Sequence, residues 1–313
     1  MTDRLVRALT ADGRVRVIGV NIAQSLAEAH RRHKLSPLAT AALGRTMSAS
    51  LLLASNMKQA QARVNVRAAG DDSGLGLVYA DAGFDGTVRG FVSNAHYDLA
   101  PLANGQQNVS QGIGQTGLLK VMRDVGYGDP YSSTVELITG DIANDVAWYL
   151  ASSEQTFSKL ILTEVIDQND SQSPVKVAAG ILMQIMPKAT LRAAKAKNRS
   201  QEELLAQLET KNNPQQLTDL LLEGKEIEAV MTELFADMNL DILPMTKDVK
   251  FHCPCSFERM LAAMRMFGKE ELESMIAEGN GAEATCHFCS EVYHATTEQL
   301  QSLLPDAQVG ATA

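Results

Sequence analysis

The four cysteines of this 313-residue chain lie together near its C-terminal end, at Cys253, Cys255, Cys286 and Cys289. They form a C-x-C pair and a C-x-x-C pair, separated by residues 256–285. Four thiolates complete the tetrahedral shell of a structural Zn²⁺ ion, and a long spacer allows the second pair to fold back onto the first. The pattern therefore predicts one zinc ion held by these four cysteines.

Other uses of the same thiols make different demands. Permanent disulfides are typical of secreted proteins, and nothing in this sequence indicates secretion. Four thiolates also suit an iron–sulfur cluster, but the two-plus-two spacing favours zinc. His252, His287 and His294 lie near the cysteines, yet with four sulfurs available we expect none of them to be a ligand.

The composition bounds the protein class. Apolar residues make up 45% of the chain, which is enough to build a hydrophobic core. The net charge is −9, so the protein is acidic. From Phe251 onward the acidic side chains clearly outnumber the basic ones, which argues against nucleic-acid binding. No stretch resembles a signal peptide or approaches the about 20 apolar residues of a membrane span. We expect a cytoplasmic protein with reduced thiols and no membrane partner.

Residues 1–187 are expected to form an α+β core domain. Residues 36–55 predict a helix with Ser36 as its N-cap and Pro37 at its first position. Glycine-separated β-like runs predict antiparallel hairpins. The expected strands cover residues 15–22, 62–70, 74–83, 86–95, 133–140, 159–167 and 174–187, and a second helix covers residues 141–155.

No motif in this domain indicates catalysis. Residues 112–117 match G-x-G-x-x-G, but the polar sequence before them favours a turn between strands over a dinucleotide-binding loop. His30, His33 and His96 have no evident nucleophile partner. There is no G-x-S-x-G motif and no P-loop lysine, so we expect a protein that is not an enzyme.

Residues 188–247 are expected to form a helical linker. Ser200 and Glu203 match a capping box, and Pro214 suits the start of a second helix. Residues 227–235 place apolar side chains on one stripe of a third helix. Helices this short are unstable alone in water, so their stripes must pack on something, most simply a sheet face of the core domain. The linker is then either an ordinary packed subdomain or a removable cover over apolar surface.

Residues 248–300 are expected to form the zinc module, followed by a tail at residues 301–313. Within it, residues 268–279 predict a helix. We also expect a small apolar cluster, formed by Phe257, Met260, Leu261, Met264, Met266 and Phe267. So short a module has little core, and bound metal would supply on the order of 10 kcal/mol of its folding free energy. Oxidation of either cysteine pair would remove two ligands, release the metal and unfold the module.

At these residues the chain resembles the bacterial 33-kDa heat-shock protein family of redox-regulated chaperones. The resemblance spans nearly the whole chain. It is carried by the C-x-C pair with residues 256–259, the spacer at 268–279, residues 286–293, and the segments 36–45, 86–92 and 149–158. Ala295 departs from the family pattern, which has an aromatic residue there, and this affects only local packing of the module.

The resemblance implies a mechanism. The reduced zinc form is inactive, and oxidants produce the disulfides Cys253–Cys255 and Cys286–Cys289. Zinc leaves, the module and linker unfold, and the protein becomes an ATP-independent holdase, a homodimer when oxidised, that binds unfolding client proteins under oxidative stress.

Three alternative functions for the cysteine pattern predict different features. A zinc-ribbon nucleic-acid module would need a basic face, and a thiol oxidoreductase would need C-x-x-C in a thioredoxin-like βαβ context. A purely structural zinc module on an enzyme would keep its metal under mild peroxide, whereas a sensor would lose it.

Overall fold

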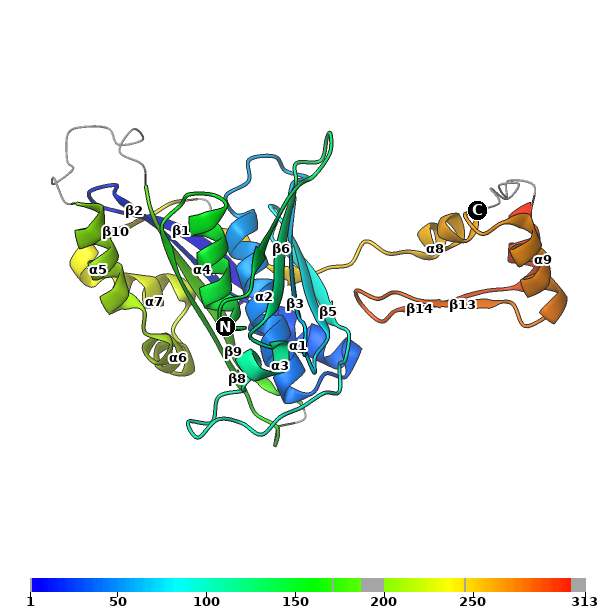
Figure 1. The fold of residues 1–313 in the computed structure, drawn as a ribbon, viewed down its shortest axis with the longest axis horizontal. Coiled ribbons are helices and arrows are strands. Elements are labelled where there is room, and N and C mark those ends of the chain that lie inside the picture. The colour runs from blue at the N-terminus through cyan, green and yellow to red at the C-terminus, as the bar shows by residue number, and fades with distance from the viewer. Residues whose placement is uncertain (1, 171, 187–199, 245, 305–313) are drawn as a thin grey trace. The chain divides into compact units, whose positions relative to one another are not determined.

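The computed structural model describes residues 2–170, 172–186, 200–244 and 246–304 of the chain. It divides into two compact units, residues 1–252 and residues 253–313 (Figure 1). The α+β class predicted from the sequence is confirmed. Within the described ranges, no helix has the length and apolar character needed to cross a membrane.

The first unit contains two six-stranded sheets. Sheet A has the order β10-β1-β2-β9-β8, with β11 also paired to β1, and all its pairs are antiparallel. Its strands are β1 (Arg4–Thr10), β2 (Val15–Asn21), β8 (Ser158–Ile166), β9 (Val175–Ile185), β10 (Leu240–Ile242) and β11 (Lys247–Asp248).

Sheet B has the order β12-β5-β4-β3-β6-β7. Its pairs are antiparallel except for the parallel pair of β12 and β5. Its strands are β3 (Arg63–Gly70), β4 (Leu77–Gly83), β5 (Thr87–Val92), β6 (Gly117–Asp124), β7 (Tyr131–Glu136) and β12 (Lys250–Phe251). The hairpins expected from the glycine-separated runs are therefore confirmed for β3, β4 and β5.

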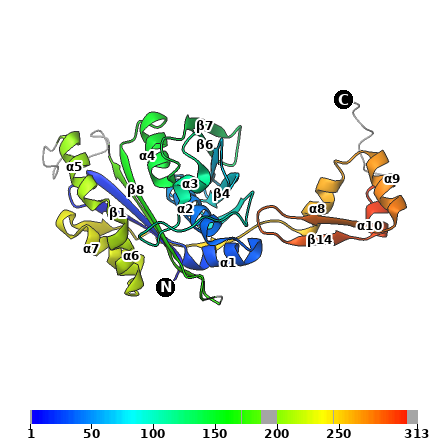
Figure 2. The same cartoon turned by 60° about the horizontal axis from the view of Figure 1, so that its bottom comes forward.

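Helix α2 (Pro37–Ala54) lies between the two sheets, as Figures 1 and 2 show. Every residue of α2 is buried except Pro37 and Arg45, and both sheets contribute to the core around it. The predicted cap is confirmed, because the Ser36 hydroxyl accepts a hydrogen bond from the Ala39 N–H at 3.0 Å. The Arg45 charge is matched by Glu164 at 2.7 Å. Three more helices complete this core: α1 (Ala23–His33), α3 (Val109–Ile113) and α4 (Ile142–Ser152).

Some sequence expectations for this core need correction. The segment 112–117 is not a turn between two strands. Helix α3 ends at Ile113 and β6 begins at Gly117, so the segment connects a helix to a strand. Gly114 and Gly117 have φ values of 95° and 134°, which explains the glycines there. The strand expected at 133–140 ends at Glu136. Strands β1 and β6 and helix α1 were not predicted.

The helical segment of residues 200–238 covers the outer face of sheet A (Figure 2). It consists of α5 (Gln201–Lys211), α6 (Pro214–Leu222), α7 (Ile227–Leu234) and the 3₁₀ turn η2 (Ala236–Met238). The capping box of Ser200 and Glu203 is confirmed. The apolar stripes of these helices pack on the sheet, as predicted. The helix side chains in this cluster are Leu204, Leu208, Leu217, Leu220, Leu221, Ile227, Val230, Met231, Leu234, Phe235 and Met238.

Polar contacts add to this docking. Glu228 on α7 pairs with Arg4 on β1 at 3.0 Å, and Glu209 on α5 pairs with Lys159 on β8. After the helices, residues 240–244 and 246–252 run along the edges of both sheets. β10 and β11 pair with β1, β12 pairs with β5, and the His252 N–H donates to the Val88 carbonyl at 3.0 Å. The chain is thus held by backbone hydrogen bonds up to the residue before Cys253.

The second unit has a small core. Its elements are α8 (Phe257–Met264), α9 (Lys269–Glu278), β13 (Ala282–Thr285), β14 (Val292–Ala295) and α10 (Thr297–Gln301), so the predicted spacer helix is confirmed. Its buried apolar residues are Met260, Met264, Leu272, Ala295, Leu300 and Leu303. The expected cluster was partly wrong, because Met266 and Phe267 are 79% and 44% exposed. Ala295 lies inside this core.

Gly19 offers a test of how closely the helical segment packs on sheet A. A Cβ atom at Gly19 would lie 2.4 Å from Met231 Sδ and 3.0 Å from Ile227 Cγ1. We predict that Gly19→Val displaces α7 and weakens its docking by about 1–3 kcal/mol, the usual cost of overpacking. Limited proteolysis should cleave residues 200–238 faster. Gly268→Ala is the control, because a Cβ there meets open space; equal cleavage of both variants and wild type would contradict the prediction.

Candidate metal centre

The first cysteine pair lies on an extended segment between β12 and α8. Cys253 follows His252, the last residue held to sheet B, and Cys255 precedes Ser256. Ser256 is the N-cap of α8, and its hydroxyl accepts a hydrogen bond from the Arg259 N–H at 3.3 Å. This cap fixes the direction in which the chain leaves Cys255.

The second pair lies in the turn of the β13–β14 hairpin. The strands pair from Ala282↔Ala295 to Thr285↔Val292, and the Cys286 N–H then donates to the Glu291 carbonyl at 2.9 Å. The Ser290 N–H donates to the Cys286 carbonyl at 2.8 Å, and Ser290 has a φ of 54°. This tight turn brings Cys286 and Cys289 to the same side of the hairpin end.

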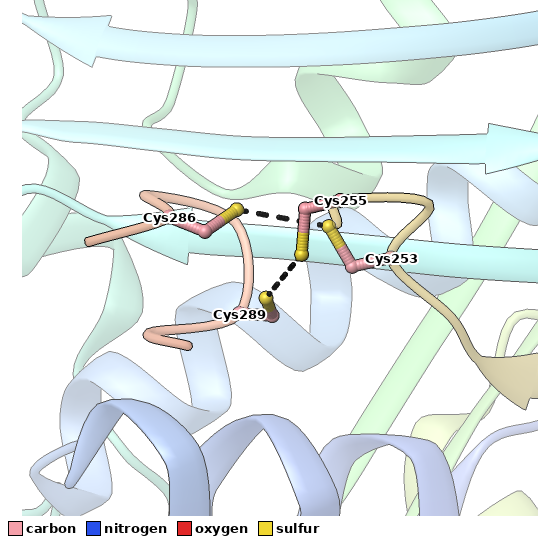
Figure 3. Close-up of side chains that lie close together, drawn as sticks. All are labelled: Cys253, Cys255, Cys286 and Cys289. Atoms are coloured by element: carbon pink, nitrogen blue, oxygen red, sulfur yellow. Dashed lines mark hydrogen bonds between the residues drawn. The ribbon is translucent and has the colours of Figure 1, made fainter. Parts of the chain in front are cut away.

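The four sulfur atoms converge, as Figure 3 shows. Cys253 Sγ lies 3.8 Å from Cys286 Sγ, Cys255 Sγ lies 3.3 Å from Cys289 Sγ, and all four atoms lie within 4.8 Å of one another. All are in the thiol form, without disulfides. A tetrahedron with metal–sulfur bonds of about 2.3 Å has sulfur–sulfur edges of about 3.8 Å. The donor set and its spacing therefore suit one metal ion.

The environment opposes ionisation of two of these thiols when no metal is bound. Burial raises the pKa of both Cys286 and Cys289, and Cys289 is only 2% exposed. Backbone N–H groups of Phe288 and Glu291 donate to these sulfurs and act in the opposite direction. The thiolate charge that burial penalises is the charge a cation would neutralise.

Tyr293 is a residue of the site that sequence reasoning missed. It lies on β14, and its hydroxyl donates a hydrogen bond to Cys255 Sγ at 3.1 Å. This hydrogen bond raises the pKa of the Tyr293 hydroxyl. Its position in the sequence, four residues after the last cysteine, gave no signal, because only the hairpin fold brings its hydroxyl across to the first cysteine pair.

The neighbouring histidines do not join the cluster. Over the described part of the chain, the group of side chains suited to a metal contains the four cysteines alone. His294 pairs with Glu283 across the hairpin at 3.4 Å. His252 is held through its backbone to sheet B, and His287 lies within the turn.

Comparisons with known proteins match this chain to one protein family over nearly its whole length. The family described as Hsp33 protein matches residues 3–296. A 33 kDa chaperonin from Cyanothece sp. (strain PCC 7425) is 47% identical over 99% of both chains, and one from Synechocystis sp. (strain PCC 6803) is 47% identical over 98% of both. The crystal structure of the 33 kDa chaperonin (heat shock protein 33 homolog) from Thermotoga maritima is 29% identical, with a TM-score of 0.84, and the match covers 97% of this chain and 98% of that one.

The raised pKa values of Cys286 and Cys289 predict a pH dependence of metal binding. Both thiols are protonated in the metal-free protein at neutral pH, so a metal must displace at least these two protons. Affinity for Zn²⁺ should therefore fall by at least about 100-fold for each unit by which the pH is lowered. Competition with a chromogenic chelator between pH 8 and pH 6 measures this. A pH-independent affinity would contradict thiolate ligation.

Proposed function

The chain belongs to the Hsp33 family, and from that premise we propose that it is a redox-regulated, ATP-independent holdase chaperone. The reduced form holds one Zn²⁺ ion and is inactive. Oxidation of the cysteines releases the metal and exposes apolar surface that binds unfolding proteins. One observation carries the proposal. The four thiols converge directly after the short edge strands that follow the helical segment on sheet A.

We assign the zinc to Cys253, Cys255, Cys286 and Cys289. When bound, the ion would supply a charge centre that keeps all four sulfurs as thiolates and ties the C-x-C segment to the hairpin turn. The described core of this unit is small, so the metal is expected to contribute most of its folding free energy. Loss of the metal then means loss of the fold, as in other small zinc domains.

The oxidation step can be written with peroxide as oxidant. Two thiolates give up two electrons and a sulfur–sulfur bond forms. The oxygen–oxygen bond of hydrogen peroxide breaks, and with these two electrons and two protons from the solvent the peroxide becomes two waters. We propose the pairs Cys253–Cys255 and Cys286–Cys289. The two sulfur contacts at 3.8 and 3.3 Å instead join one pair to the other. Once the unit unfolds, near neighbours in sequence meet more often than distant ones, which favours the proposed pairing.

Unfolding of the second unit reaches the helical segment through the chain between η2 and Cys253. The described residues of this connection pair with the rest of the first unit through the short strands β10, β11 and β12, which have few hydrogen bonds each. Short edge strands are marginal by themselves and open readily. When they open, α7 loses the anchor at its C-terminal side.

The surface under the cover suits unfolded clients. On sheet A it consists mainly of aliphatic side chains, namely Val6, Ala8, Val15, Val17, Ile161, Val177, Ala179, Ile181 and Met183. An exposed aliphatic sheet face of this kind binds other apolar chains without requiring a defined sequence. We further propose a cytoplasmic location, where thiols are held reduced at rest, and a homodimeric oxidised form.

The proposal predicts that the protein loses zinc and gains chaperone activity in the same step. Reduced protein treated with peroxide or hypochlorite at mild heat should release about one Zn²⁺ per chain. In the same samples it should begin to suppress aggregation of a heat-unfolded client. A thiol reductant with added zinc should reverse both. Zinc that stays bound, or leaves without any gain in client binding, would mean that the site is only structural.

The Gly19→Val variant tests the role of the helical segment of residues 200–238 separately from metal binding. Its cysteines are unchanged, so it should bind zinc as wild type does. If uncovering sheet A is what activates the protein, this variant should suppress client aggregation while reduced and zinc-bound. Gly268→Ala should remain inactive until oxidised. An inactive, zinc-bound Gly19→Val protein whose helical segment is demonstrably open to proteases would place the client surface elsewhere.

A further inference from the structure

Sulfur atoms of the site accept hydrogen bonds from groups outside the cysteine cluster. Cys286 and Cys289 accept from backbone N–H groups in the hairpin turn, and Cys255 accepts from the Tyr293 hydroxyl at 3.1 Å. Hydrogen bonds to a sulfur ligand draw electron density from it. Of these three donors only Tyr293 is a side chain, so it is the one whose contribution a substitution can remove.

The position of the Tyr293 hydroxyl is fixed by its surroundings. Tyr293 pairs with Ala284 across the hairpin, and its ring packs against the buried core of the second unit. The hydroxyl therefore reaches Cys255 from a rigid element, while Cys255 lies on the extended segment before α8. The contact joins the hairpin to the C-x-C segment.

We propose that Tyr293 sets the sensitivity of the cysteine site to oxidants by restraining the nucleophilicity of Cys255. This inference rests on the proposed function and deepens it. Oxidation by a peroxide begins when a thiolate sulfur attacks one peroxide oxygen: the sulfur–oxygen bond forms, the oxygen–oxygen bond breaks, and the departing oxygen leaves as water after protonation. The Cys253 thiolate then attacks the sulfenic sulfur of Cys255, and the hydroxyl leaves as a second water when it is protonated.

The Tyr293 hydrogen bond opposes the first of these steps. Its donor stabilises charge on the sulfur in the resting state, and that charge is lost to oxygen as the new bond forms. The hydrogen bond is therefore stronger before the attack than after it. Removing it should make Cys255 more reactive. If Tyr293 were instead only a structural contact, its loss would weaken zinc binding without changing the rate at which the bound site reacts.

The Tyr293→Phe variant tests this, because it keeps the ring and its packing. Zinc-loaded, reduced variant and wild type are treated with hydrogen peroxide over a range of concentrations, and zinc release is followed with a chromogenic chelator. Thiol alkylation and mass spectrometry follow Cys255 in the same samples. We expect the second-order rate constant for loss of the Cys255 thiol to rise about fivefold. This increase corresponds to part of the free energy of a hydrogen bond to a charged group. Tyr127→Phe is the control, since Tyr127 is 64% exposed in the first unit.

A second measurement identifies a purely structural role. The zinc affinity of both proteins is measured under reducing conditions, without oxidant. An unchanged oxidation rate with zinc-loaded Tyr293→Phe, or a slower one, overturns the inference, whatever the affinity. Wild-type protein that releases no zinc under peroxide would instead overturn the proposed function itself. The two failures are therefore distinguishable within one experiment.

Discussion

The second unit must hold four sulfur atoms within 4.8 Å of one another with very little core to help. Six apolar side chains are buried there over the described residues, and charge on four neighbouring thiolates would repel without a cation between them. A metal ion resolves both problems, because it neutralises the sulfurs and cross-links the C-x-C segment to the hairpin turn. We propose that this unit therefore depends on the metal, and that its fold persists only while the sulfurs remain thiolates.

The first unit shows the opposite balance. Helix α2 is buried between two sheets and needs nothing from the cysteines. The helical segment on sheet A stands between these extremes. It covers a continuous aliphatic face, but its chain connection toward Cys253 runs through strands of two or three residues. The two-sheet core, the helical segment on sheet A and the cysteine unit thus follow one another along the chain. We propose that this order allows a reaction at sulfur to change what sheet A exposes.

The sequence was informative where local chemistry decides structure. Ser36 with Pro37, and Ser200 with Glu203, indicate helix starts directly, and glycine-separated β-branched runs indicate the hairpins. The cysteine spacing indicated which four sulfurs converge. It was uninformative where distant segments decide structure. The strand β1 lacks a clear alternation, and the contact between Tyr293 and Cys255 depends on the hairpin register. Met266 and Phe267 are apolar, yet they follow the end of α8 and face solvent, which periodicity beyond a helix end does not predict.

We propose that the state of the cysteines controls the docking of helices α5–α7, and amide hydrogen exchange measures this docking segment by segment. Exchange is measured on the full chain in its reduced, zinc-loaded form and after peroxide oxidation at mild heat. We expect residues 201–234 to lose protection on oxidation together with residues 253–301, while β3, β4 and β6 stay protected. Loss of protection confined to residues 253–301, with α5–α7 still protected, would contradict it.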